Sequence, residues 1–358
     1  MLIRSIHLAL GYTVEIASDF RGLAGALATL GIDRAVIVTN PTVRTLHGAA
    51  LAAELQQVAP HWIELPDGEA HKNLDTWRFL VSALLVHRVD RNTAVIAFGG
   101  GVIGDLAGFA AATVLRGLPL VQVPTTLLAA VDASVGGKTG VNTPEGKNLV
   151  GAFHQPKLVW TALHTHRTLP VRERRCGLGE VLKHAVLDGP GAFAGVNAGA
   201  SELGGDDENR AADAVALSVA VKARLVEADP YEAGDRVLLN LGHTLGHAVE
   251  AALGYGAMSH GEAVCIGMIA AARFGQELAG TSPAFVRELE RTAAGLGLAT
   301  ELPADLDPAE LVTAMRFDKK RERGMVKLVI PVSAGDVRLI VVPDTALVRL
   351  AEHGRVRK

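Results

Sequence analysis

The first half of the chain alternates short apolar runs with longer amphipathic stretches. Four runs rich in β-branched and other apolar residues predict buried strands, at residues 34–40, 61–65, 93–98 and 120–124. Between the second and third of them, residues 73–88 repeat apolar positions at helical spacing. Because strands that alternate with helices form βαβ units, we expect a Rossmann-like α/β domain with a parallel sheet.

The second half has apolar residues at helical spacing over most of its length. Near its end, two apolar runs flank Ser333-Ala334-Gly335, which predicts a hairpin. The expected fold class is therefore an α/β N-terminal domain (1–171) plus an all-α, or mainly helical, C-terminal domain (172–358), with a cleft between them. Helices are predicted at residues 177–187, 212–228, 236–253, 262–274 and 283–296.

Composition narrows the class of protein. The 358 residues are 49% hydrophobic and 20% charged, with a net charge of -3, which is typical of a globular protein with a large core. No block of like charges favours nucleic acid or an anionic membrane as a partner. The start lacks the apolar core of a signal peptide, no apolar run is long enough for a bilayer, and the two cysteines form no Cys-x-x-Cys pair. A cytoplasmic protein is expected.

A glycine-rich turn follows the third predicted strand and opens a helix. Gly99, Gly101 and Gly104 match G-x-G-x-x-G, in which glycine lets the backbone approach a pyrophosphate and the helix N-terminus stabilises its charge. No acidic residue follows at the distance usual for a ribose contact, so a plain strand-to-helix turn is the alternative. Glu69 and Lys72 in an earlier loop can supply the missing polar contacts.

A Gly-Lys-Thr sequence at residues 137–139 suggests a P-loop. That motif needs an earlier glycine at the position where this chain has Asp132, so we reject it. What remains is a glycine-rich segment that presents Lys138 beside Asp132, followed by Lys147 and Asn148. Lysines presented in this way suit phosphate, and solvated surface lysines are the alternative.

Residues 236–253 predict one helix with an apolar face and a polar stripe. Gly242 and Gly246 each cost about 1 kcal/mol in a helix, which predicts close approach of a ligand or a neighbouring backbone. An ordinary solvent-facing stripe is the alternative. The stripe holds Arg236, Asn240, His243, His247 and Glu250.

Two further patterns suggest a metal site. Ser259 and Glu262 are spaced as a capping box, so a helix should begin near His260. Glu180 and Lys183 fall on one face of another predicted helix. A carboxylate and two imidazoles are sufficient for a catalytic zinc-type site with open positions, although the four-residue spacing of His243 and His247 also suits a metal-binding pair.

Taken together, these motifs resemble the 3-dehydroquinate synthases, which are sugar-phosphate cyclases. The resemblance runs in order from about residue 35 to about residue 335. The matching segments are residues 66–72, 99–111, 116–117, 123–142, 146–156, 177–185, 240–250 and 260–264.

The resemblance implies a dehydroquinate synthase-like fold and conversion of 3-deoxy-D-arabino-heptulosonate 7-phosphate to 3-dehydroquinate and phosphate. This lyase reaction belongs to the shikimate pathway of aromatic amino acid biosynthesis. It implies transient oxidation by NAD, phosphate elimination, reduction, ring opening and intramolecular aldol closure, with one divalent metal (zinc or cobalt) and a homodimer. A sibling cyclase acting on sedoheptulose 7-phosphate, a metal-dependent alcohol dehydrogenase and a non-catalytic binding protein are the alternatives.

The family's motifs also imply roles for residues of this chain. The implied metal ligands are Glu180, His243 and His260, and the implied catalytic residues are Asp132, Lys138, Lys183, Asn240 and His247. In this scheme Lys222 and Arg236 bind the substrate carboxylate, and Asn240 and His247 lie near the phosphate. The other implied substrate contacts are Lys138, Asn148, Arg116 from the second subunit, and Lys319 or Lys320.

The NAD contacts implied by the resemblance come mainly from the N-terminal half. Relatives often carry Asp at the position of Asn40, so this chain departs from the family pattern there. The set comprises Asn40, Glu69, Lys72, Gly100, Gly101, Val102, Asp105, Thr125, Thr126, Lys138, Lys147 and Thr168.

Overall fold

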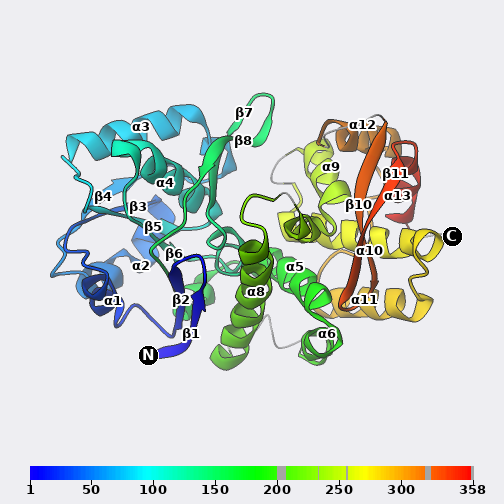
Figure 1. The fold of residues 1–358 in the computed structure, drawn as a ribbon, viewed down its shortest axis with the longest axis horizontal. Helices are drawn as coiled ribbons and strands as arrows, with labels where there is room; N and C mark the ends of the chain where they lie inside the picture. Colours follow the sequence, from blue (N-terminus) through cyan, green and yellow to red (C-terminus); the bar gives the residue numbers. More distant parts are fainter. Residues whose placement is uncertain (200–206, 233, 255–256, 319–323, 356–358) are drawn as a thin grey trace. The chain divides into compact units, whose positions relative to one another are not determined.

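The computed structural model describes residues 1–199, 207–232, 234–254, 257–318 and 324–355 (Figure 1). Their packing divides the chain into two compact units. Unit one comprises Met1–Pro170 with Ala211–Ala223, and unit two comprises Val171–Arg210 with Arg224–Lys358. The domain boundary at residues 171/172 stays a prediction, because compact units and independently folding domains are different properties.

A seven-stranded sheet forms the centre of unit one, in the order β1-β2-β9-β6-β5-β3-β4. The outer pair β1-β2 is antiparallel, and the other neighbours are parallel. All four predicted strands are confirmed, as β3, β4, β5 and β6. The strands are β1 (Leu2–Leu8), β2 (Tyr12–Ala17), β3 (Ala35–Thr39), β4 (His61–Glu64), β5 (Ala94–Gly99), β6 (Leu120–Pro124) and β9 (Leu158–Ala162), with a separate hairpin of β7 (Lys138–Thr143) and β8 (Gly146–Phe153).

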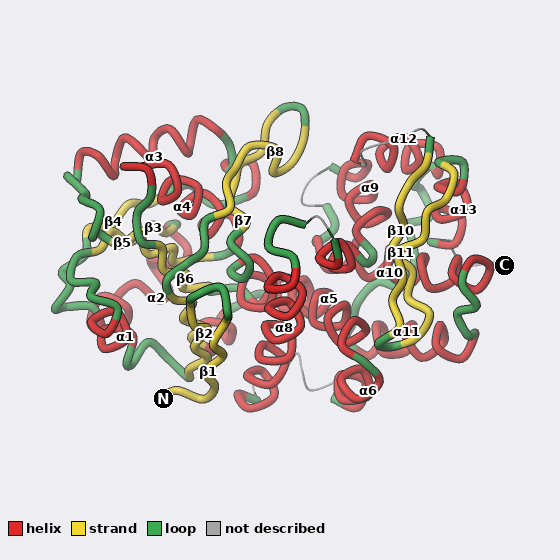
Figure 2. The backbone as a smooth tube through the Cα atoms, in the orientation of Figure 1, coloured by secondary structure: helices red, strands yellow, loops and turns green. Residues whose placement is uncertain are grey.

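Helices cover both faces of this sheet (Figures 1 and 2). Ile37 and Phe98 point into a core shared with α1 and α2, whereas Val36 and Ala97 point into a core shared with α3 and α4. Because both faces are covered, the central strands β3, β5 and β6 are buried at every position and apolar at all but Thr39 and Gln122, which explains their nearly continuous apolar runs in the sequence. The helical segments are α1 (Leu23–Thr29), α2 (Pro41–Glu54), η1 (Glu69–His71), α3 (Leu74–Val86), α4 (Gly101–Thr113), η2 (Val114–Arg116), η3 (Ala129–Ala133) and η4 (Leu163–Thr168).

The neighbouring strands β3 and β5 form a topological switch point. They pair in parallel, but the helices that follow them, α2 and α4, cover opposite faces of the sheet. Open α/β sheets bind their ligands at the carboxyl ends of strands at such a point. Asn40 follows β3 and Gly100 follows β5, so the topology brings these predicted NAD contacts to one edge.

The described residues of unit two form helices and one hairpin. Its core joins α9, α10, α12 and α13 with the apolar face of β10. The predicted hairpin and the predicted Ser259–Glu262 capping box are both confirmed. The elements are α5 (Val171–Asp188), α6 (Pro190–Ala198), η5 (Asp235–Asn240), α9 (His243–Leu253), α10 (His260–Leu278), α11 (Pro283–Gly295), α12 (Pro308–Asp318), β10 (Met325–Ser333), β11 (Asp336–Pro343) and α13 (Ala346–His353).

Helix α8 (Glu208–Ala228) contributes residues to both units. It corresponds to the helix predicted at residues 212–228, and it begins four residues earlier because Asp207 caps it. The Asp207 side chain accepts hydrogen bonds from the backbone of Asn209 and Arg210. Among the described residues, no helix combines the length and the apolar character needed to cross a bilayer.

The prediction of a single helix over residues 236–253 is wrong. The segment forms η5, turns at Gly242, and continues as α9. Gly242 has a φ of 81°, and a Cβ atom there would overlap the carbonyl oxygen of Val264 on α10. The chain turns because α10 packs directly against it, so Arg236 and Asn240 do not share a helical stripe with His243.

Candidate metal centre and nucleotide-binding edge

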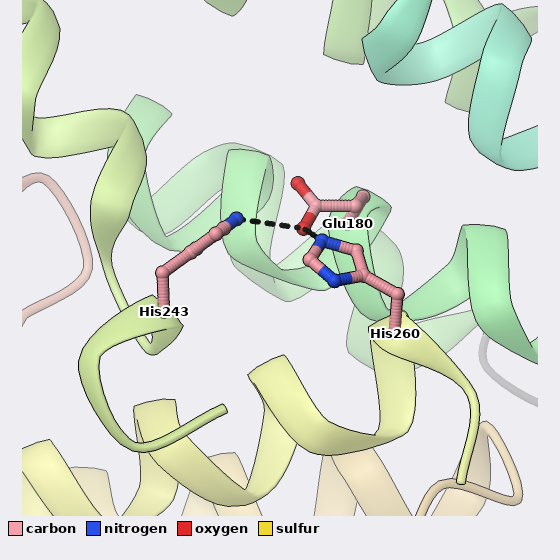
Figure 3. Close-up of side chains that lie close together, drawn as sticks. All are labelled: Glu180, His243 and His260. Atoms are coloured by element: carbon pink, nitrogen blue, oxygen red, sulfur yellow. Dashed lines mark ion pairs between the residues drawn. The ribbon is translucent and has the colours of Figure 1, made fainter. Parts of the chain in front are cut away.

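Three predicted ligands of unit two lie together (Figure 3). Glu180 is on α5, and His243 and His260 are the first residues of α9 and α10. The Oε1 atom of Glu180 lies 3.7 Å from Nε2 of His243 and 3.6 Å from Nε2 of His260. Two ligand atoms of a tetrahedral zinc, each about 2.1 Å from the ion, lie roughly 3.4 Å apart. The spacing therefore fits one divalent metal ion.

The environment of Glu180 supports the same interpretation. The side chain is fully buried, and its Oε1 atom makes no hydrogen bond within the described residues. Its other oxygen contacts the ammonium group of Lys183, one helical turn away. A buried carboxylate oxygen without a donor is costly, and a cation among these three ligands would remove that cost.

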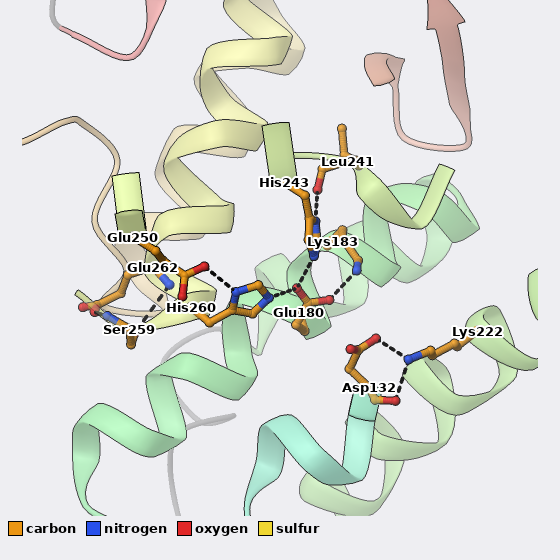
Figure 4. A network of polar contacts seen from close by, with 10 residues as sticks. All are labelled: Asp132, Glu180, Lys183, Lys222, Leu241, His243, Glu250, Ser259, His260 and Glu262. Atoms are coloured by element: carbon orange, nitrogen blue, oxygen red, sulfur yellow. Dashed lines mark hydrogen bonds and ion pairs between the residues drawn. The ribbon is translucent and has the colours of Figure 1, made fainter. Parts of the chain in front are cut away.

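The two histidines are oriented by hydrogen bonds of their other ring nitrogens. Nδ1 of His243 donates to the carbonyl oxygen of Leu241 (3.1 Å), and Nδ1 of His260 donates to the carboxylate of Glu250 (2.9 Å; Figure 4). These bonds leave each Nε2 lone pair directed at Glu180. Burial, with smaller contributions from Lys183 and His247, holds the pKa of His243 well below its ordinary value, which favours the neutral form that binds metals.

A glycine adjoins each of the three ligands in the chain, and each of these glycines lies against another segment of unit two. A Cβ atom at Gly179 would overlap the backbone of Gly261, one at Gly261 would overlap that of Cys176, and one at Gly242 would overlap that of Val264. The predicted close approach at Gly242 and Gly246 is confirmed, and in both cases the approaching group is the backbone of α10. These contacts bring α5, α9 and α10 close enough for their side chains to meet.

Among the described residues, no group of three potential ligands contains both His243 and His247. The His247 ring lies beside the cluster, with its centroid 5.2 Å from that of His243 and 5.9 Å from that of His260. A second group combines His247 with Glu250 and His260. His243 and His247 therefore belong to different groups of potential ligands: His243 lies with Glu180, and His247 lies with Glu250.

Arg236 and Asn240 are held by a loop that the sequence patterns did not single out. Arg236 is 1% exposed, and its guanidinium donates to the carbonyl oxygen of Pro230 at 2.6 Å. The Asn240 amide donates to the carboxylate of Glu232 at 3.0 Å. Glu232 has a φ of 60°, which is unusual for a residue with a side chain. Its position after the end of α8 offers no periodic pattern that could have predicted this contact.

In unit one, Lys72 lies at the centre of a polar network. The buried Lys72 ammonium pairs with Asp105 (2.5 Å) and donates to the side chain of Asn148 (2.5 Å). Burial raises the pKa of the Asp105 carboxyl, and the charge of Lys72 offsets part of that rise. Glu69 accepts a hydrogen bond from Asn142 at 2.8 Å. The structure thus joins the predicted NAD contacts Glu69, Lys72 and Asp105 to the segment that carries Asn148.

The predicted glycine-rich turn is confirmed as the connection from β5 to α4. A Cβ atom at Gly100 would press on Thr126, and one at Gly101 would touch Ala133, so the turn packs against the segment after β6. The hydroxyl of the buried Thr125 makes no hydrogen bond within the described residues. Val102 occupies the first turn of α4.

Two other predicted NAD contacts, Asn40 and Thr168, form hydrogen bonds within the protein. The Asn40 side chain caps α2 by accepting from the backbone of Val43 at 3.0 Å. The Thr168 hydroxyl lies 2.8 Å from Nε2 of His47 and donates to the carbonyl oxygen of Thr165. Both residues follow carboxyl ends of parallel strands, β3 and β9 respectively.

Lys222 and Asp132 form an ion pair within unit one (Figure 4). The Lys222 ammonium donates to the Asp132 side chain (2.7 Å) and to its backbone carbonyl (2.6 Å). Asp132 lies in η3, a single π-helical turn, and such turns often occur at functional sites. Lys222 is 7% exposed, so its charge is held in place by this pair.

The remaining predicted residues lie on hairpins and loops. Lys138 is exposed at the first position of β7, which confirms the rejection of a P-loop because a strand follows it where a P-loop needs a helix. Lys147 is on the partner strand β8. Arg116 is exposed at the end of η2 with a φ of 64°. Lys319 and Lys320 lie outside the described residues.

Comparisons with known proteins agree along the chain. A family model described as 3-dehydroquinate synthase N-terminal matches residues 62–176, and one described as 3-dehydroquinate synthase C-terminal matches residues 177–321. A curated 3-dehydroquinate synthase from Symbiobacterium thermophilum is 43% identical over 341 residues, which is 94% of each sequence.

Solved structures of sibling cyclases have the same fold. A 2-deoxy-scyllo-inosose synthase in complex with carbaglucose-6-phosphate, NAD+ and Co2+ superimposes with a TM-score of 0.89 at 24% identity, over 98% of this chain and 100% of that one. A 2-epi-5-epi-valiolone synthase from Streptomyces hygroscopicus subsp. jinggangensis 5008, with NAD+ and Zn2+ bound, gives 0.84 at 28% identity, over 98% and 99%.

Proposed function

Because this chain belongs to the 3-dehydroquinate synthase family, we propose that it converts 3-deoxy-D-arabino-heptulosonate 7-phosphate to 3-dehydroquinate and phosphate. The observation that carries the proposal is the buried cluster of Glu180, His243 and His260, in a chain that matches the family through both of its halves. The protein is thus an enzyme, a carbon–oxygen lyase of the shikimate pathway.

The cluster is the proposed site of one divalent metal. A carboxylate with two neutral imidazoles suits both zinc and cobalt, the ions held by the two sibling cyclases. A divalent metal held by these three residues would supply Lewis-acid chemistry, which polarises a hydroxyl group or a ketone. Lys183 contacts the ligand Glu180, so its ammonium is placed to neutralise charge at the same position.

The switch point of unit one is the proposed NAD site. NAD held there would supply the hydride acceptor that a transient oxidation of the substrate requires. The N-terminus of α4, opened by Gly100 and Gly101, stabilises a pyrophosphate, while the Lys72 ammonium adds a buried positive charge. Further proposed contacts are Asn40, Glu69, Val102, Asp105, Thr125, Thr126, Lys138, Lys147 and Thr168.

Cationic side chains are proposed to hold the two charged ends of the substrate. Lys222 and Arg236 are both nearly buried, which makes their charges effective partners for a carboxylate. Asn240, His247 and Lys138 are assigned to the phosphate and the reacting ring. Asp132, Lys183, Asn148, Arg116 and Lys319 or Lys320 complete the proposed set.

The closest alternative is a sibling cyclase that acts on sedoheptulose 7-phosphate, a sugar phosphate without a carboxylate. Two observations favour the heptulosonate. The identity is 43% to the curated dehydroquinate synthase, against 28% to the 2-epi-5-epi-valiolone synthase. The chain also carries both Lys222 and Arg236, the two buried cations proposed to bind a carboxylate group that sedoheptulose 7-phosphate lacks.

The proposal extends to the assembly and the location of the protein. We assign it to the cytoplasm, where the shikimate pathway operates and where its two buried, unpaired cysteines stay reduced. We also assign a homodimer, in which Arg116 of one subunit serves the other. The exposure of Arg116 on η2 is compatible with such a contact.

A single assay tests the function. The protein is incubated with the heptulosonate phosphate, catalytic NAD and Co2+, and both phosphate release and formation of the carbocycle are measured. We expect both products from the heptulosonate phosphate and neither from sedoheptulose 7-phosphate. Absence of both products, in protein shown to bind Co2+ and NAD, contradicts the proposal.

A further inference from the structure

Glu250 is a buried carboxylate that contacts the cluster of Glu180, His243 and His260 but is not one of these three proposed ligands. It lies on α9, two helical turns after His243, and is 7% exposed. Its Oε2 atom is 2.9 Å from Nδ1 of His260 (Figure 4). An ionised carboxylate can only accept hydrogen bonds, so the imidazole proton of His260 is on Nδ1.

The hydrogen bond at Nδ1 determines the state and the position of Nε2, the ring nitrogen of His260 that faces Glu180. With the proton on Nδ1, the Nε2 atom keeps its lone pair, and it lies 3.6 Å from Oε1 of Glu180. Without a bond at Nδ1, an imidazole at the start of a helix can turn about its Cβ–Cγ bond or exchange tautomers. Either change removes Nε2 from the position of a ligand.

Two devices therefore hold His260, and they act on different atoms. The capping box of Ser259 and Glu262 holds the backbone at the first turn of α10. Glu250 holds the ring. Because Glu250 and His243 are on the same helix, α9 provides one ligand directly and orients a second.

We propose that Glu250 is a positioning residue that fixes the tautomer and the ring orientation of His260 and so sets the affinity of the Glu180–His243–His260 cluster for a divalent metal. The proposal rests on the function proposed above. The competing arrangement is the second group of potential ligands, in which Glu250 binds the metal directly with His247 and His260. Carboxylates that orient a metal-binding histidine typically contribute 10- to 100-fold, roughly, to metal affinity.

Binding of Co2+ alone tests the proposal, because the visible absorption of the bound ion reports its ligands without any need for activity. Glu250→Ala is expected to weaken Co2+ binding by about 10- to 100-fold. Glu250→Gln keeps an amide oxygen that accepts the same hydrogen bond, so it should bind Co2+ within a few-fold of the unmodified protein and with an unchanged spectrum. His247→Ala should leave the Co2+ spectrum unchanged.

Glu277→Ala is the matched control. Glu277 lies on α10 and pairs with His353 at 3.1 Å, so its removal breaks a similar carboxylate–histidine contact outside the three-ligand cluster. We expect the folded variant to bind Co2+ with unchanged affinity, even if it unfolds at a lower temperature than the unmodified protein. Thermal unfolding of the metal-free variants shows whether each one folds.

The possible failures can be distinguished. If Glu250→Gln loses the Co2+ spectrum as fully as Glu250→Ala does, Glu250 is a ligand and the positioning role is wrong. Unchanged Co2+ affinity in a folded Glu250→Ala variant also overturns it, although the proposed function then stands. If the unmodified protein binds Co2+ no better than a Glu180→Ala variant, the metal site fails, and both proposals fail with it.

Discussion

Lys222 is a residue whose proposed role can be separated from that of the metal ligands. Its ammonium already pairs with one carboxylate, that of Asp132, at 2.7 Å. A hydrogen bond to a charged group contributes about 1.5–3 kcal/mol, so we expect Lys222→Ala to weaken binding of the heptulosonate phosphate by roughly 10- to 100-fold. Binding of Co2+ should not change. Substrate and Co2+ titrations of the same preparation measure both quantities.

The control for Lys222 is Arg224→Ala, two residues further along α8. The Arg224 side chain is 58% exposed and pairs with Asp188. Its removal should leave both titrations unchanged, because an exposed ion pair contributes little. An equal loss of substrate and Co2+ binding in Lys222→Ala would defeat the assignment of Lys222 to the substrate carboxylate.

His166 should make the stability of the protein depend on pH. Burial, with a smaller contribution from His164, lowers the pKa of His166 from 6.5 to about 4. The unfolded chain takes up the proton near the ordinary value, whereas the folded protein resists it, so stability is complete above about pH 6.5 and falls as the pH falls towards 4. From about pH 6.5 to pH 5 the loss is about 2 kcal/mol.

Urea unfolding at several pH values, followed for His166→Leu beside the unmodified protein, measures this dependence. The variant should lose about 2 kcal/mol less over that interval. The pKa of His47 is also lowered by burial, so part of the slope should remain in the variant. Identical slopes in the two proteins would show that His166 is accessible to protons in the folded state.

Two of the residues that meet at the metal cluster, Glu180 and His260, belong to short local patterns, whereas the choice of His243 over His247 came from the resemblance to the family. Glu180 and Lys183 share a helical face, and Ser259 with Glu262 marks the start of the helix that presents His260. The bond between Glu250 and His260 has no such pattern, since it joins two helices across a loop. The sequence placed Glu250 only on a polar stripe.

At the scale of helices, glycines set the separation of the segments that carry the ligands. A Cβ atom at Gly261 would overlap the backbone of Cys176, so α10 must move away from α5 in a Gly261→Ala variant. Overpacking of this kind typically costs 1–3 kcal/mol, approximately. We also expect at least about a 10-fold loss of Co2+ affinity, because His260 moves with α10 while Glu180 stays on α5.

Gly195→Ala on α6 is the matched substitution. Among the described residues, a Cβ atom there would meet no heavy atom within 4 Å apart from its own helix, so the variant should keep its Co2+ affinity and gain up to about 1 kcal/mol from the better helix propensity of alanine. Urea unfolding and Co2+ titration of both variants provide the comparison. Similar behaviour of the two variants would mean that the α5–α10 crossing tolerates a methyl group.

The break between η5 and α9 could not be predicted from the spacing of apolar residues. Apolar positions continue at helical spacing across Gly242, so the apolar pattern does not mark the turn, and Gly242 alone predicted only a close approach. Its cause is the backbone of α10, which is distant in sequence. Strand β8 was missed for a related reason: it is mostly exposed, so it lacks the alternation of a half-buried strand. Strand β9, in contrast, is fully buried and carries an apolar run like those of the predicted strands.

At the scale of the whole molecule, the fold class followed from the change of pattern between the two halves, and the structure and the comparisons confirm it. The strand order did not follow, because apolar runs show that strands are buried without showing which strands are neighbours. Strands β9, β2 and β1 extend the sheet beyond β6, and β4 is the edge strand at the other side. The switch point between β3 and β5, and the NAD site proposed there, depend on that order.

The proposed homodimer predicts a mass in solution of twice the 37.4 kDa chain, and it makes the role of Arg116 testable by mixing subunits. Arg116→Ala and Glu180→Ala should each be nearly inactive alone. In a mixed dimer, the subunit that carries Arg116→Ala keeps its own Glu180 and receives Arg116 from the other subunit, so one complete site forms. Random association then restores about a quarter of the sites.

The control mixture combines Glu180→Ala with His243→Ala. Both residues act in the same subunit, where they contribute to one cluster, so no mixed dimer holds a complete site and activity should stay absent. Light scattering and mass spectrometry of differently tagged subunits verify that mixed dimers form in both experiments. If mixed dimers of Arg116→Ala and Glu180→Ala form and stay inactive, Arg116 serves its own subunit. A monomeric mass in solution would contradict the proposed homodimer. The exposed Arg116 on η2 could then not contact the substrate of a second subunit, and its assignment would be wrong.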